Sequence, residues 1–236
     1  MKKSLMMVLF SVVAAMAVET NGTVIANFEH EKVATRPVSF IPAVGNWIVG
    51  EDDKSKVLVV DGRRWKSGEA SSGIAEQAKS LYGERYAEFL DNVKAFAYYP
   101  YAVAKDVENF TDGEISMKFK GIDGRIDQAA GILFDLKQNG DYLAIRANPL
   151  ENNLVLWKFE RGKRSSVKWV RDVKTTSNQW HSIKLVVKGT KIEGWVNGAL
   201  VLTHENLAPI SGRVGIWSKA DSVVYFDDYI VSKTQL

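Results

Sequence analysis

From residue 111 onward, apolar and polar residues alternate along the chain with a period of two. Because successive side chains of a β-strand point to opposite faces, this alternation predicts half-buried antiparallel strands. Asn139-Gly140 and Asn197-Gly198 lie between such runs and favour type I′ hairpin turns. Many short strands with regular turn signals predict an all-β fold, an antiparallel two-sheet jelly-roll sandwich. The positions expected to face the core are Ile115, Met117 and Phe119; Ile132, Phe134 and Leu136; Leu143 and Ile145; Val155, Trp157 and Phe159; and Ile183, Leu185 and Val187.

The N-terminal half carries a second kind of pattern. Residues 24–28, 47–49 and 57–60 are typical of short strands, but residues 74–93 repeat their apolar positions at helical spacing. We therefore predict a helical insertion at about residues 74–93, lying across the sandwich. Its apolar stripe comprises Ala78, Leu81, Tyr82, Tyr86, Phe89 and Val93.

The start of the chain has the pattern of an export signal. Lys2 and Lys3 precede an apolar run over residues 5–13, and Ala15-Met16-Ala17 fits a small-residue cleavage site. That run is too short to cross a bilayer as a regular helix. We predict a signal peptide over residues 1–17 and a single domain over 18–236, exported to the periplasm or the extracellular space.

Composition narrows the function classes. The formal net charge of the chain is +3, and removal of Lys2 and Lys3 lowers it to +1. A nearly neutral chain with mixed charges does not favour nucleic-acid binding. The sequence contains no Cys, which excludes disulfides, thiolate metal sites and a cysteine nucleophile. The histidines, His30, His181 and His204, are far apart and share no metal-ligand spacing.

The segment 212–231 predicts a closing pair of strands joined by the turn Lys219-Ala220-Asp221-Ser222. In the second strand Val224, Phe226 and Ile230 mark one face, and Asp228 falls on that same face. A carboxylate on an apolar face needs a partner or a metal, because burying a lone charge is very costly.

Calcium is one partner for such a carboxylate. If the first and last strands are neighbours, Glu29 would join Asp227 and Asp228 in a structural calcium site, since Ca²⁺ takes about six to eight oxygen ligands. In the alternative interpretation these acids bind backbone amides or an arginine.

A polar group on one predicted strand and its neighbours is typical of a saccharide site. Arg146 and Asn148 share a strand face with Tyr142, Glu151 follows on the next turn, and Arg164 lies on the next hairpin. Amides, a guanidinium, a carboxylate and aromatic faces together suit sugar hydroxyls and sugar rings. The alternative is the polar outer face of a sheet. The predicted ligand-binding residues are Arg146, Asn148, Asn153, Lys158, Trp217 and Lys219.

Several motifs together resemble a known fold family. They are Gln128-Ala-Ala-Gly-Ile-Leu-Phe, Gly140-Asp-Tyr-Leu-Ala-Ile-Arg-Ala-Asn, Glu151-Asn-Asn-Leu, Gly162-Lys-Arg, Trp180-His, Val196-Asn-Gly and the closing strand pair. This set resembles the concanavalin A-like (LamG-type) jelly rolls, and among them the bacterial domains named 3-keto-disaccharide hydrolase or family-16-like glycoside hydrolase. The resemblance covers about residues 111–231.

The resemblance implies a carbohydrate-active protein that hydrolyses a glycosidic bond, with an acid among Glu151 and Asp221 assisting cleavage. The chain also departs from the family: the usual Leu-Phe-Asn-Gly opening is replaced by Ile25-Ala-Asn-Phe-Glu, and the helical insertion is extra. The Glu-x-Asp-x-x-Glu pattern of the retaining glucanases is absent. The alternatives are a non-catalytic module that binds a glycan or a partner of the cell envelope, and a structural envelope protein without a small ligand.

Overall fold

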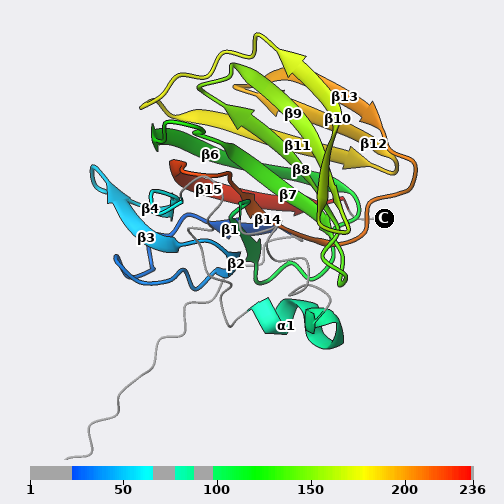
Figure 1. The fold of residues 1–236 in the computed structure, drawn as a ribbon, viewed down its shortest axis with the longest axis horizontal. Helices are drawn as coiled ribbons and strands as arrows, with labels where there is room; N and C mark the ends of the chain where they lie inside the picture. The colour runs from blue at the N-terminus through cyan, green and yellow to red at the C-terminus, as the bar shows by residue number, and fades with distance from the viewer. Residues whose placement is uncertain (1–22, 66–77, 88–97, 235–236) are drawn as a thin grey trace, which may run out of the picture.

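The computed structural model describes residues 23–65, 78–87 and 98–234, and it contains two antiparallel sheets packed face to face (Figure 1). This confirms the predicted all-β jelly-roll sandwich. The eight-stranded sheet runs in the order β13-β12-β11-β6-β15-β4-β3, and β1 pairs with β15. Its strands are β13 (Ala199–Glu205), β12 (Lys191–Val196), β11 (His181–Lys188), β6 (Gly113–Asp123), β15 (Val223–Lys233), β4 (Ser55–Asp61), β3 (Trp47–Asp52) and β1 (Thr23–Ala26).

The second sheet has seven strands in the order β10-β9-β8-β7-β14-β5-β2. Its strands are β10 (Lys163–Arg171), β9 (Asn153–Glu160), β8 (Tyr142–Asn148), β7 (Ala130–Leu136), β14 (Arg213–Trp217), β5 (Tyr101–Ala104) and β2 (Phe40–Val44). The sequence pattern did not reveal β2 and β5. Both are short and almost wholly buried, so neither shows the apolar and polar alternation of a half-exposed strand.

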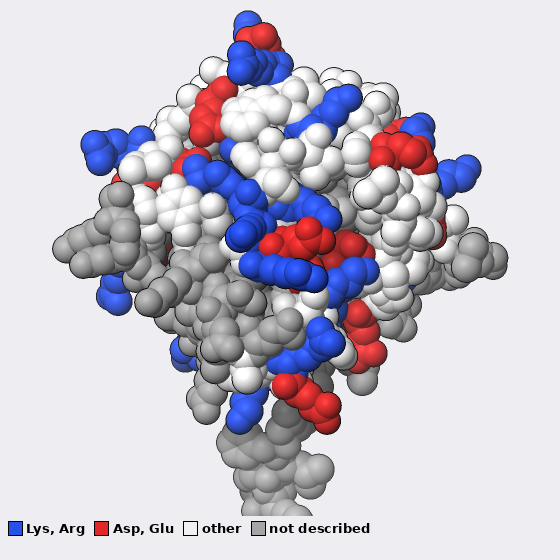
Figure 2. All heavy atoms as spheres, turned by 45° about the vertical axis from the view of Figure 1, so that its right-hand side comes forward, with Lys and Arg blue, Asp and Glu red and all other residues white. Residues whose placement is uncertain are grey.

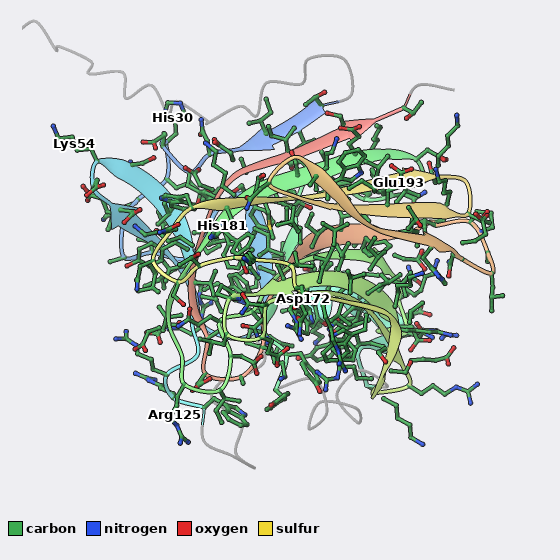
Figure 3. The ribbon with its side chains drawn as sticks, turned by 90° about the horizontal axis from the view of Figure 1, so that it is seen from above. His30, Lys54, Arg125, Asp172, His181 and Glu193 are labelled. Atoms are coloured by element: carbon green, nitrogen blue, oxygen red, sulfur yellow. The ribbon has the colours of Figure 1, made fainter. Side chains whose placement is uncertain are left out.

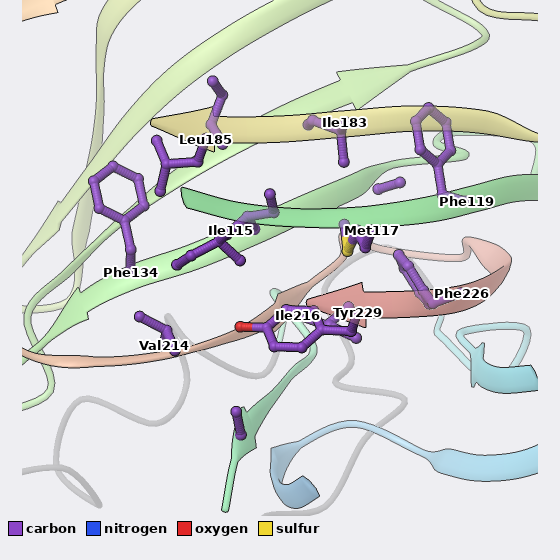
Figure 4. Close-up of a cluster of buried hydrophobic side chains, with 14 of the residues drawn as sticks. Ile115, Met117, Phe119, Phe134, Ile183, Leu185, Val214, Ile216, Phe226 and Tyr229 are labelled. Carbon is purple, nitrogen blue, oxygen red and sulfur yellow. The ribbon is translucent and has the colours of Figure 1, made fainter. Parts of the chain in front are cut away.

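The main core lies between the sheets and is built from most of the alternating apolar positions of the sequence (Figure 4). The prediction is wrong for β9 and for the end of β7: Val155, Trp157, Phe159 and Leu136 lie in a second apolar cluster, and Leu154 and Leu156 of β9 face the core instead. Ile115, Met117 and Phe119 of β6 point into it, and so do Ile183 and Leu185 of β11. Phe134 of β7 and Ile145 of β8 meet them from the other sheet. Side chains from both inner faces thus fill one layer, as expected for a β-sandwich.

The first and last described strands are neighbours, as the calcium hypothesis required, with Ala26 of β1 opposite Tyr229 of β15. One prediction for β15 is wrong. A register shift between Asp227 and Ile230, with Asp228 at a φ of 48°, turns Ile230 out of the core and Tyr229 into it. Such a β-bulge adds a residue to one strand and so reverses the alternation beyond it.

The seven-stranded sheet is also covered on its outer face. A second apolar cluster there includes Tyr101, Tyr142, Phe159 and Trp217, and the helix α1 (Ala78–Tyr82) packs on it (Figure 1). The 3₁₀ turn η1 (Gly83–Arg85) follows α1. The predicted helical insertion is therefore confirmed for residues 78–85. The rest of 74–93 lies partly outside the described residues, as does the predicted signal peptide.

Across the described part of the chain, no helix is both long enough and apolar enough to cross a membrane.

The core between the sheets gives a direct stability prediction. Leu185 is fully buried there, whereas Leu207 is fully exposed, at 102% of its reference area. Leu185→Ala is expected to lower the free energy of unfolding by about 2–5 kcal/mol, because it removes buried surface and leaves a cavity. Leu207→Ala should change it by no more than about 0.5 kcal/mol. Urea unfolding measures both, and equal losses would contradict this description of the core.

Candidate functional site

The outer face of the seven-stranded sheet changes from apolar to polar toward one end of its strands. Tyr142 and Ala144 of β8 belong to the second apolar cluster, and Arg146 and Asn148 continue the same face two and four residues after Ala144. On β9, Asn153 shares the face of Val155 and Trp157. On β10, Arg164 lies opposite Phe159 and Trp169 lies opposite Val155, so both belong to this face.

Arg146 is at the centre of this polar region and is only 1% exposed. Its Nη1 donates to Glu151 Oε2 at 2.9 Å and to Asn153 Oδ1 at 2.8 Å. Asn153 Nδ2 donates to the same Glu151 oxygen at 2.9 Å. Burial lowers the pKa of Arg146, but the Glu151 charge opposes this effect. A buried guanidinium thus fixes the position of a carboxylate that reaches the surface.

Glu151 stays ionised at neutral pH. Burial acts to raise the pKa of its carboxyl group, but the Arg146 charge and the hydrogen bonds from Asn153 and Arg146 outweigh burial and hold the pKa below its usual value. Because the side chain is 35% exposed, one edge of this carboxylate can accept hydrogen bonds from a ligand.

Aromatic rings surround the two arginines. The Arg164 guanidinium lies 4.1 Å from the ring centre of Trp157 and 5.2 Å from that of Tyr99. Arg146 lies 5.8 Å from the same Trp157 ring. Trp169, which is 46% exposed, meets Trp157 edge to face at 5.5 Å. The site thus combines flat apolar surfaces with fixed charges.

Three buried donors in this cluster have no hydrogen-bond partner among the described residues: Arg146 Nε, Trp157 Nε1 and Arg164 Nη1. Leaving a buried donor unpaired costs roughly 1–3 kcal/mol, so such atoms are rare in folded proteins. Their concentration around one indole ring marks this part of the sheet as a place where further acceptors would be stabilising.

A second polar group lies at the adjoining ends of β7, β8 and β14. Asp127 is fully buried, and Asn148 Nδ2 donates to its Oδ1 at 2.8 Å. Lys219 Nζ lies 2.6 Å from Asp127 Oδ2 and 5.5 Å from the ring centre of Tyr98. Burial raises the pKa of Asp127, and the hydrogen bond and charge of Lys219 oppose that rise.

Asp221 anchors a neighbouring loop. Its carboxylate accepts hydrogen bonds from the backbone N–H groups of Arg125, Ile126 and Asp127 at distances between 2.9 and 3.1 Å. The loop borders a hollow of about 450 Å³, and Arg125 projects outward there (Figure 3). Trp65, on the wall of this hollow, meets Tyr98 edge to face at 4.8 Å. The hollow therefore adjoins the polar site through Tyr98.

The structure brings most of the predicted ligand-binding residues together. Arg146, Asn153 and the predicted acid Glu151 contact one another directly. Asn148 and Lys219 meet at Asp127. Asp221, the other predicted acid, reaches the site only through the loop that it anchors.

Two predicted ligand-binding residues lie elsewhere. Trp217 is fully buried. Its indole N–H donates to the Tyr142 hydroxyl at 3.1 Å, and its ring stacks on Tyr99 at 5.7 Å, so it supports the site from inside the protein. Lys158 points to the opposite face of β9 and pairs with Glu160 at 2.9 Å.

The sequence interpretation missed Trp157 and Tyr99 as site residues, and it placed Arg164 on the neighbouring hairpin without assigning the face of the sheet to which it points. The alternation in β9 already placed Trp157 on the face of Val155, but that face was assigned to the core. Arg164 follows the turn at Gly162, and its face depends on how β10 pairs with β9, including a register shift between Ser166 and Lys168. Only the pairing of the strands reveals that position.

The three predicted calcium ligands have protein partners. Glu29 accepts from Ser55 Oγ at 2.7 Å, Asp228 pairs with Lys118 at 2.7 Å, and Asp227 accepts from the Asp228 N–H. Within the described ranges, no three or more His, Asp or Glu side chains are arranged to hold a metal ion. His30 and His181 are likewise separated (Figure 3). The structure therefore does not group these carboxylates as a calcium site.

Charges of both signs are mixed at the surface. In the space-filling view, Lys and Arg side chains gather beside Asp and Glu in the middle of one face, and uncharged residues surround them (Figure 2).

The fold is that of a concanavalin A-like jelly roll, as the resemblance implied. It is similar to the carbohydrate-binding module CBM66 from Bacillus subtilis, with a TM-score of 0.58 and 12% identity over 85% of this chain and 100% of that one. A β-glucanase from Bacillus licheniformis gives a TM-score of 0.52 and 11% identity over 92% and 100% of the two chains. An apo Crh5 transglycosylase gives 0.50 and 12% identity over 91% and 85%.

Neither a protein-family model nor a curated protein sequence matches this chain.

The bulge in β15 gives a pH-dependent prediction. Burial raises the pKa of Asp227 to about 6; the Asp228 N–H and Lys118 oppose the rise, while the charges of Asp228 and Glu29 add to it. Between about pH 4 and pH 6 the folded state keeps a proton that the unfolded state has lost, so stability falls as the pH rises through this window. Asp227→Asn cannot ionise and keeps the hydrogen bond from Asp228.

Asp227→Asn is therefore expected to be more stable than the parent protein above about pH 6.5 and equally stable near pH 3.5. Urea unfolding at several pH values measures the difference. A difference that is the same at all pH values would show that the ionisation of Asp227 is not coupled to folding.

Proposed function

We propose that this protein binds a saccharide on the outer face of the seven-stranded sheet, around Trp157. The observation that carries the proposal is the group of three unpaired buried donors, on Arg146, Trp157 and Arg164, beside the partly exposed carboxylate of Glu151. The donors would meet ring and hydroxyl oxygens, and Glu151 would accept from hydroxyl hydrogens.

The aromatic residues of this site suit the apolar faces of sugar rings. Trp169 is exposed and meets the buried Trp157 edge to face, so a sugar ring could pack on Trp169 at the border of the polar cluster. Small-ligand sites commonly combine an aromatic lining with a few fixed polar groups. The polar groups here are held by contacts within the protein, so they lose little freedom when a ligand binds.

The fold likeness supports the same proposal, because the titles of the similar structures name a carbohydrate-binding module, a β-glucanase and a transglycosylase. Fold alone does not fix function, since one fold carries many activities. The proposal therefore depends on the side chains around Trp157, and the likeness adds to it.

Glycoside hydrolysis is a second candidate use of this site. The pKa of Asp127 is raised and that of Glu151 is lowered, and such opposite shifts are typical of acid and base pairs. Asp127, however, is fully buried behind Lys219, and both oxygens of Asp221 bind loop amides. Of the two acids first considered, Glu151 is the better candidate, and binding without turnover is the favoured function.

The proposed setting is outside the cytoplasm. It depends on the signal-like pattern of residues 1–17, with two lysines before an apolar run and Ala15-Met16-Ala17 after it. A saccharide-binding module of the cell envelope, periplasmic or extracellular, fits that pattern and the proposed ligand.

Saccharide binding is tested by isothermal titration calorimetry on the chain from residue 18 onward, using laminarin, levan, xylan and polygalacturonate as probes. Trp169→Ala is expected to weaken binding roughly two- to tenfold, because an aromatic contact contributes about 0.5–1.5 kcal/mol. Trp180→Ala is the matched control, because Trp180 is 37% exposed but donates to Asp52, away from the site.

Equal weakening in both variants, or none in Trp169→Ala, would place the ligand elsewhere. The bound probe is also assayed for release of reducing ends. Turnover that is lost in Glu151→Gln would select hydrolysis over binding alone.

A further inference from the structure

The geometry points to an acidic saccharide as the ligand, with its anionic group bound by Arg164. This inference rests on the proposed function and narrows it to one class of sugar. The group that Arg164 would recognise is a planar or tetrahedral anion attached to the sugar, a carboxylate or a sulfate ester, and the experiment below separates these two.

Arg164 differs from the other cations of the site in its partners. Arg146 pairs with Glu151 at 2.9 Å, and Lys219 pairs with Asp127 at 2.6 Å. Arg164 forms no ion pair with any side chain in the described part of the chain, and its contacts there are the rings of Trp157 and Tyr99. Of these three cations, it is therefore the one without a carboxylate partner among the described residues.

Arg164 is held against an aromatic ring. Its guanidinium carbon lies 4.1 Å over the Trp157 ring centre, so this ring covers one side of the guanidinium. Nη1 is buried and has no partner among the described residues, while the side chain as a whole is partly exposed. A guanidinium held in this way is prepared for a two-pronged bond to an anion.

The neighbouring unpaired atoms have the same polarity. Arg146 Nε and Trp157 Nε1 are donors, so the unpaired atoms of this cluster can only be satisfied by hydrogen-bond acceptors of a ligand. A sugar hydroxyl can accept, but it also brings a donor and no charge. An ionised carboxylate or a sulfate offers only acceptors and balances the charge of Arg164. Charge-assisted bonds of this kind are roughly twice as strong as those between neutral groups.

The experiment compares acidic glycans with neutral counterparts of the same backbone by calorimetry. The pairs are polygalacturonate and its methyl ester, alginate and its propylene glycol ester, and oligosaccharides of κ-carrageenan before and after chemical desulfation. One acidic member is expected to bind at least about tenfold more tightly than its neutral counterpart, and to lose that advantage in high salt. A uronate that binds identifies a carboxylate, and carrageenan identifies a sulfate.

Arg164→Gln should abolish the preference for the acidic member, because it weakens binding of the acidic member far more than binding of the neutral one. Lys163→Gln is the matched control, because Lys163 is the adjacent exposed cation at the start of β10 and faces the other way; it should keep the preference. Arg164→Lys, which keeps the charge without the planar stack, should fall between the two. Thermal unfolding of each variant confirms that it is folded.

Equal binding of every acidic and neutral pair, or an unchanged preference in Arg164→Gln, would overturn the inference. If neutral glycans bind and respond to Trp169→Ala in that case, the proposed function stands without it. If no glycan binds in either set of experiments, both proposals fail.

Discussion

Burial of the Arg146 guanidinium on the outer face of β8 is the interaction on which the candidate site depends. A charge that is only 1% exposed is very costly without partners, and Glu151 and Asn153 supply them. That requirement fixes the turn after β8, keeps Glu151 ionised at the surface, and places Arg146 beside the Trp157 ring. Removal of either polar partner would leave a buried charge with incomplete compensation.

The outer face can bury a charge because apolar material covers it as well as the inner face. The eight-stranded sheet has an apolar side toward the core, whereas the strands β8 and β9 are buried along nearly their whole length. The helix α1 and the aromatic cluster of Tyr101, Tyr142 and Trp217 account for this second burial. The polar site therefore lies at the border of an apolar cluster, where electrostatic interactions are stronger than in water.

The fold could be predicted from the sequence because β6 and β11 alternate cleanly, with Ile115 and Leu185 on the core side. Three features could not be predicted. The bulge at Asp228 reverses which side chains of β15 face the core, and nothing in the pattern of apolar and polar residues indicates it. The short strands β2 and β5 carry no alternation. The burial of Trp217 depends on its stacking with Tyr99, which is far from it in the chain and lies just before β5.

The candidate site, too, could be predicted from the sequence only in part. Arg146, Glu151 and Asn153 are close in the sequence, so the turn after β8 was enough to suggest that they meet. The pairing of Lys219 with Asp127 joins residues far apart in the chain, and the position of Arg164 depends on the register of β10. Contacts of that kind follow from strand pairing and not from local pattern.

Ligand binding around Trp157 is tested most directly by NMR, which follows the indole N–H resonances while a glycan that binds in calorimetry is added. Trp157→Phe assigns the Trp157 signal, and Trp47, whose Nε1 donates to the Val44 carbonyl between the sheets at 2.8 Å, is the internal reference. If the glycan binds around Trp157, the Trp157 indole signal shifts strongly at saturation and the Trp47 signal does not shift. Saturation that leaves the Trp157 signal unmoved would contradict the assignment of the binding site to the outer face of the seven-stranded sheet.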